Sequence, residues 1–170
     1  MPEAEILLTT AELAVAFAGF ASLVTILGRR FSRVDPRIIA MRFRGMLTNS
    51  LLVVAFSMIP LLLFRYGLRE IVVWRVSSVL LALAGGTNFL ALVLHARPLF
   101  TEAVPISLVR RVVTFGLIGL AEVVLVLNAS GVTEPIAGAA YLTGLLLFLS
   151  IAGFAAAWLF VSFIESSNSE

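Results

Sequence analysis

The sequence contains five apolar segments, each about as long as a helix that crosses a lipid bilayer. A hydrocarbon core of ~30 Å requires ~20 apolar helical residues, and an isolated strand in lipid would leave its backbone groups unpaired. We predict helices at about residues 5–28, 37–64, 70–95, 111–129 and 136–164. We therefore expect an all-α membrane protein, a compact bundle of about five transmembrane helices in one domain over residues 1–170, with residues 165–170 as a disordered tail.

Composition agrees with this class. The chain is 61% hydrophobic and only 13% charged, which lies outside the range of soluble globular domains. Its formal charge of +2 is too small to indicate nucleic-acid binding, and the absence of cysteine excludes disulfides and thiolate metal sites.

The distribution of arginines predicts the orientation, because cytoplasmic connections retain positive charge. Six arginines lie in or beside the first connection: Arg29, Arg30, Arg33, Arg37, Arg42 and Arg44. Three more flank the third connection, Arg97, Arg110 and Arg111, whereas the second has only Arg65 and Arg69. We expect the amino terminus outside and the carboxyl terminus in the cytoplasm, with the first six arginines contacting anionic lipid headgroups.

Three ionisable residues are predicted to lie inside the membrane at similar depths. Glu12 and Glu122 are each about seven residues from the outer ends of their helices, and Arg75 is about five, which places all three roughly 7 to 10 Å below the outer boundary. Because a buried arginine is costly unless paired, we expect Arg75 to contact Glu12, Glu122 or both. The acid that remains could bind a proton or a cation. Alternatively, the three residues form a structural clasp, or Arg75 extends to the outer headgroups while the acids stay protonated.

A second polar layer is predicted toward the cytoplasmic half of the bundle. It contains Ser22, Asn49, Asn88 and Thr114. Such side chains commonly form hydrogen bonds between membrane helices, so packing is the first interpretation and pore lining the second.

Catalytic signatures are absent from the sequence. The chain has one histidine, one aspartate and no cysteine, and it contains no pair of histidines at metal-binding spacing, no phosphate-binding glycine loop and no serine nucleophile elbow. We therefore expect no enzymatic activity, no catalytic residue, no cofactor and no metal.

Two hypotheses of function remain. The first is an oligomeric ion channel or ion-coupled transporter that uses the Glu12, Arg75 and Glu122 layer. The second is a non-conducting accessory or assembly subunit of a larger membrane complex. The expected partners are membrane lipids and either further copies of the chain or another membrane protein. The segment AFAGFASLVTILGRR is similar to segments of many small bacterial membrane proteins, which implies the bacterial cytoplasmic (inner) membrane but carries no functional residue.

Overall fold

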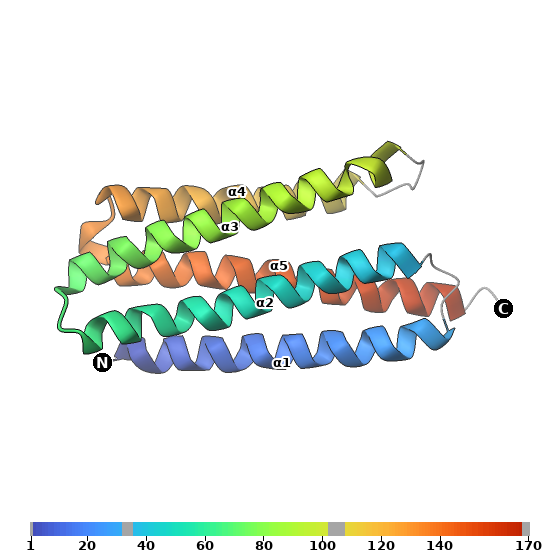
Figure 1. The fold of residues 1–170 in the computed structure, drawn as a ribbon, viewed down its shortest axis with the longest axis horizontal. Helices are drawn as coiled ribbons and strands as arrows, with labels where there is room; N and C mark the ends of the chain where they lie inside the picture. The colour runs from blue at the N-terminus through green and yellow to red at the C-terminus, as the bar shows by residue number, and fades with distance from the viewer. Residues whose placement is uncertain (1, 32–35, 102–107, 168–170) are drawn as a thin grey trace.

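The computed structural model describes residues 2–31, 36–101 and 108–167, with side chains described for residues 3–23, 26, 43–91, 93–94 and 112–158. Within these ranges the chain forms helices and no strand (Figure 1). The elements are α1 (Pro2–Phe31), α2 (Pro36–Arg65), α3 (Glu70–Thr101), α4 (Leu108–Ser130), the short 3-10 helix η1 (Glu134–Ile136) and α5 (Ala137–Ser167).

All five helices are long and apolar enough to cross a membrane. Their candidate spans are Glu3–Leu23, Phe43–Arg65, Glu70–Ala91, Val112–Ser130 and Glu134–Trp158. Most of the helices extend a few residues beyond the predicted bounds. Helix α3 continues to Thr101, and α5 continues to Ser167, so residues 165–167 are helical where we expected a disordered tail. Residues 168–170 lie outside the described part of the chain.

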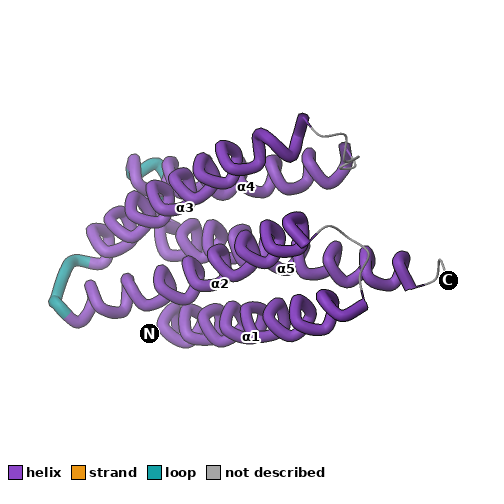
Figure 2. The backbone as a smooth tube through the Cα atoms, turned by 45° about the vertical axis from the view of Figure 1, so that its right-hand side comes forward, coloured by secondary structure: helices purple, strands orange, loops and turns teal. Residues whose placement is uncertain are grey.

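Helix α5 is the central element of the bundle. It contacts each of the other four helices, and 56% of its span is buried, against 22 to 33% for the others. Around it α1 packs on α2, α2 on α3 and α3 on α4 (Figures 1 and 2). The core is therefore built on α5. Its largest fully buried side chains include Trp74, Tyr141, Phe148, Leu7, Met46, Leu81 and Leu125.

The two connections that the structure describes lie at one end of the bundle. Figure 1 shows the amino-terminal end of α1 beside the α2–α3 and α4–α5 connections, and the carboxyl-terminal end of α5 at the opposite end. Each of these connections contains a glycine with positive φ, Gly67 at 74° and Gly131 at 87°. That backbone conformation favours glycine and ends the preceding helix.

Pro60 interrupts the hydrogen bonds of α2, and a tyrosine of α5 replaces the missing donor. Because proline has no N–H, the carbonyl of Phe56, four residues earlier, loses its intrahelical partner. The Tyr141 hydroxyl donates a hydrogen bond of 2.6 Å to this carbonyl. Tyr141 is fully buried, and its ring lies 5.7 Å from that of Trp74 on α3. This contact links α2, α3 and α5.

Candidate functional site

Arg75 forms a salt bridge with the connection between α4 and α5. Its Nη2 lies 3.2 Å from Oε2 of Glu134 in η1, and both side chains are about half exposed. The guanidinium also packs against Gly131, where a Cβ would overlap Nη2. Our prediction that Arg75 contacts Glu12 or Glu122 is therefore wrong. The clasp of these three residues that we considered is not formed either, and the salt bridge instead joins α3 to the α4–α5 connection.

Glu12 lies on the outward face of α1. Buried Leu7, Ala11 and Ala14 form the inward face of the helix, and Glu12 is exposed on the other side. No described residue forms an ion pair or a hydrogen bond with it. The small residues Ala16 and Gly19 share a helical stripe with Glu12 and predict a face packed against a neighbouring helix, but within the described part of this chain that face has no neighbour.

Of the two acids predicted to share a layer with Arg75, only Glu122 lies between packed helices. Its side chain is half-buried, and its Oε1 is enclosed without a hydrogen-bond partner. The carboxylate faces a pair of glycines on α3, because a Cβ on Gly85 would be 2.8 Å from Oε1 and one on Gly86 would be 3.9 Å from it. The absence of a side chain at Gly85 gives the carboxylate its space, whereas a Cβ at Gly86 would make only an ordinary contact with it. The ring of buried Phe148 on α5 closes the same site.

The most extensive buried hydrogen-bond network centres on Asn128, which our sequence reasoning missed. Asn128 is 1% exposed, and its Nδ2 donates to Oγ of Ser78 and to the carbonyl of Ala137, both at 2.9 Å. Its Oδ1 accepts a bond of 2.7 Å from the hydroxyl of Thr133. The network fastens the α4–α5 connection to α3. An asparagine three residues before a helix-ending glycine was the available signal, and Glu134 follows in the same polar connection.

The second polar layer is only partly assembled. Asn88 Nδ2 donates to Asn49 Oδ1 at 3.0 Å and joins α3 to α2. Ser22 bonds to the carbonyl of Ala18 in its own helix at 2.9 Å, and Thr114 is half-buried on α4. The structure thus brings together Asn49 and Asn88 as an interhelical pair, which corresponds to the packing interpretation.

Of the six arginines predicted to contact lipid headgroups, one has a described side chain. Arg44 is exposed near the start of α2. Arg29 and Arg30 lie near the end of α1, and Arg37 and Arg42 near the start of α2, at the end of the bundle opposite Arg75 (Figure 1). Arg33 lies outside the described residues.

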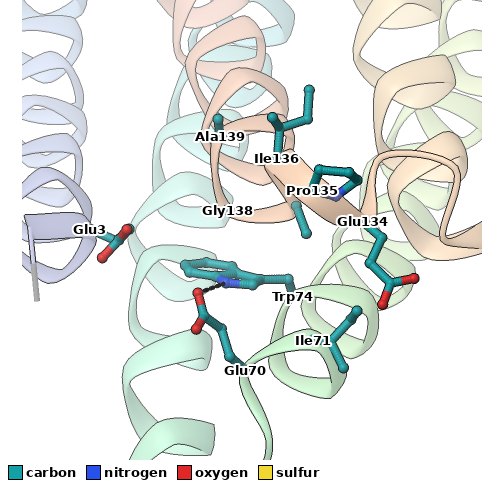
Figure 3. A pocket seen from close by; sticks show the side chains of 10 residues that line it. Glu3, Glu70, Ile71, Trp74, Glu134, Pro135, Ile136, Gly138 and Ala139 are labelled. Carbon is teal, nitrogen blue, oxygen red and sulfur yellow. Dashed lines mark hydrogen bonds between the residues drawn. The ribbon is translucent and has the colours of Figure 1, made fainter.

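A cavity of about 510 Å³ lies beside the α4–α5 connection, at the same end of the bundle as Arg75. Figure 3 shows Trp74 across it, with Gly138 against the indole and three glutamates around the ring. Glu3 comes from α1, Glu70 from α3 and Glu134 from η1. The indole Nε1 donates to Oε1 of Glu70 at 3.4 Å. Three acidic side chains therefore line one cavity at this end of the bundle, an arrangement that we did not predict.

Comparison with known proteins finds no matching family, no similar curated protein and no similar solved structure.

Proposed function

We propose that this chain is a multi-pass membrane protein with a proton or small-cation site at Glu122, and that it works as an oligomeric ion channel or ion-coupled transporter. The observation that carries the proposal is the enclosed Oε1 of Glu122, which has no hydrogen-bond partner. A carboxylate among apolar helices is costly unless a proton, a cation or a donor satisfies it. Glu122 therefore replaces the three-residue layer as the proposed binding site.

The charge at the outer end supports a cationic substrate. Glu3, Glu70 and Glu134 line the cavity there, and Arg75 pairs with only one of them. Acidic residues at the mouth of a pathway raise the local concentration of cations and disfavour anions. Glu122 lies further along the bundle, between α4 and α3, about 12 Å from the end of α4 at Ser130 by helical rise.

We further propose that the amino-terminal end of α1 faces the outside of a bacterial cytoplasmic membrane and that α5 ends in the cytoplasm. Nine arginines in or beside the first and third connections, against two in the second, support this orientation. A reporter enzyme that is active only after export should be inactive when fused after Glu170 and active when inserted at Gly67. The reverse pattern would refute the orientation.

The function is tested by measuring flux through the purified chain in liposomes. The wild-type protein should dissipate an imposed pH or sodium gradient, and Glu122→Gln should reduce the initial rate at least about tenfold, because the amide has a similar size but cannot exchange a proton or bind a cation electrostatically. The initial rate is read from a pH- or sodium-sensitive dye enclosed in the vesicles.

Glu5→Gln is the matched control, because Glu5 is an exposed acid of α1 that does not line the cavity. It should leave the flux unchanged. Equal flux from wild-type and Glu122→Gln protein, both with wild-type helicity, would remove Glu122 from the pathway. The absence of flux from folded wild-type protein across a range of pH and voltage would refute conduction altogether.

A non-conducting accessory or assembly subunit is the second candidate, and one specific observation favours it. Glu12 lies within the span Glu3–Leu23 but on the outer surface of the chain, where no described residue pairs with it. Ionisable residues in membrane spans are otherwise almost always covered by protein or water. This candidate requires a partner at α1.

A further inference from the structure

The outward face of α1 has a composition that is unusual for a surface in contact with lipid. Helix α1 lies at the edge of the bundle in both views (Figures 1 and 2). Its exposed residues include Glu12, Ala16 and Gly19, which recur at helical spacing on one stripe. A Cβ placed on Gly19 would meet nothing within 4 Å. A charged residue followed by two small residues thus faces away from the rest of the chain.

Glu12 lies too deep to reach the headgroup region. It follows Ile6, the first large apolar residue of the span, by six residues, or ~9 Å of helical rise, which exceeds the reach of a glutamate side chain. Within the described spans no cation is free to pair with it. Arg44 and Arg65 lie at the two ends of the span of α2, and Arg75 is bound to Glu134.

The balance of charge indicates what kind of partner covers this face. In the half of the bundle nearest the amino-terminal end of α1, the described acids are Glu3, Glu5, Glu12, Glu70, Glu122 and Glu134, and the described bases are Arg65, Arg69 and Arg75. A second copy of the chain would bring the same excess of negative charge to the contact. A partner with a basic side chain is complementary to it.

We propose that the outward face of α1 is a docking site for a transmembrane helix of another membrane protein, and that a lysine or arginine of that helix pairs with Glu12. Ala16 and Gly19 let the partner backbone approach closely, as small residues do in membrane helix pairs. The pair satisfies Glu12 inside the membrane. This inference rests on the membrane insertion proposed above and holds whether or not Glu122 conducts ions.

The test uses the full-length chain and synthetic helices in phosphatidylcholine vesicles. Because the chain has no native cysteine, Tyr66→Cys, at a site that is 82% exposed, accepts a single donor dye. Two acceptor-labelled peptides share an apolar transmembrane sequence and differ at one position at the depth of Glu12, which is lysine in one and leucine in the other. Energy transfer should show about tenfold tighter association with the lysine peptide.

Variants of the chain identify the face that binds. Glu12→Leu should abolish the preference for lysine, and Gly19→Leu should weaken association with the lysine peptide. Gly119→Leu is the matched control, because Gly119 is an exposed glycine of α4 whose Cβ would also meet nothing within 4 Å. It should behave as wild type. None of these positions contacts the core, so helicity should be unchanged in all three.

Three results would overturn the proposal. The first is equal binding of the two peptides, and the second is a preference for lysine that survives Glu12→Leu. The third is energy transfer between two copies of the chain that is lost on Glu12→Leu, because that result would assign the face to a second copy. The flux assay reports separately on Glu122. Loss of docking with normal ion flux would therefore overturn only the docking proposal. Loss of flux with normal docking would overturn only the proposal of ion conduction.

Discussion

A Gly85→Val chain is expected to be less stable than a Gly86→Val chain by about 1 to 3 kcal/mol, the range found when a side chain is forced into a packed core. At Gly85 a Cβ would overlap Cζ of Phe148 and lie 2.8 Å from Oε1 of Glu122. Phe148 is 2% exposed and is enclosed by the core, so its ring cannot move away without cost. At Gly86 the nearest atom is Oε1 of Glu122 at 3.9 Å, an ordinary contact.

Valine has the same intrinsic effect on the helix at both positions, so the difference between the two variants isolates the steric overlap. Denaturation in mixed detergent micelles, followed by circular dichroism, measures it. Gly85→Val should destabilise a Phe148→Ala chain less than it destabilises the wild-type chain, because the ring that clashes is then absent. Equal stability of the two valine variants would mean that α3 does not approach Phe148 and Glu122 as described.

The second large effect is expected at Asn128. Asn128→Leu preserves the approximate volume but leaves Ser78 Oγ, the Ala137 carbonyl and the Thr133 hydroxyl without their partner. A buried polar group that loses its partner costs about 1 to 3 kcal/mol, so we expect a total loss of about 2 to 4 kcal/mol. The same denaturation experiment measures it.

Ser130→Ala is the control for Asn128→Leu. Its exposed hydroxyl bonds only to the carbonyl of Leu127 in its own helix, so its loss should change the free energy of unfolding by less than about 0.5 kcal/mol. If the Asn128→Leu variant proves as stable as the Ser130→Ala variant, the network does not fasten the α4–α5 connection.

The five helices could be predicted from sequence because the length of an apolar run is a local property. The start of α2 at Pro36 follows from local chemistry in the same way, because proline is well tolerated in the first turn of a helix. Spacing also places Glu12, Ala16 and Gly19 on one stripe, but it does not determine which neighbour that stripe faces. These properties need no knowledge of neighbouring helices.

The partners of the charged residues could not be predicted, because they depend on how the helices are rotated and on the shape of the connections. Gly131, with its positive φ, turns the chain so that Glu134 lies over Arg75. Equal depth along two helices says nothing of the direction in which each side chain points. Glu12 and Glu122 differ in that direction: one faces outward from α1, the other faces the glycines of α3.

The bond between Tyr141 and the Phe56 carbonyl has a mechanical consequence. A proline in a helix ordinarily creates a hinge, since the carbonyl left free lets the two halves of the helix bend relative to each other. Here the Tyr141 hydroxyl of α5 occupies the free carbonyl and restrains that bending. Bending of α2 at Pro60 therefore requires the loss of this bond to α5. Because α5 touches every other helix, one hydroxyl group couples the bending of α2 to rearrangement of the whole bundle.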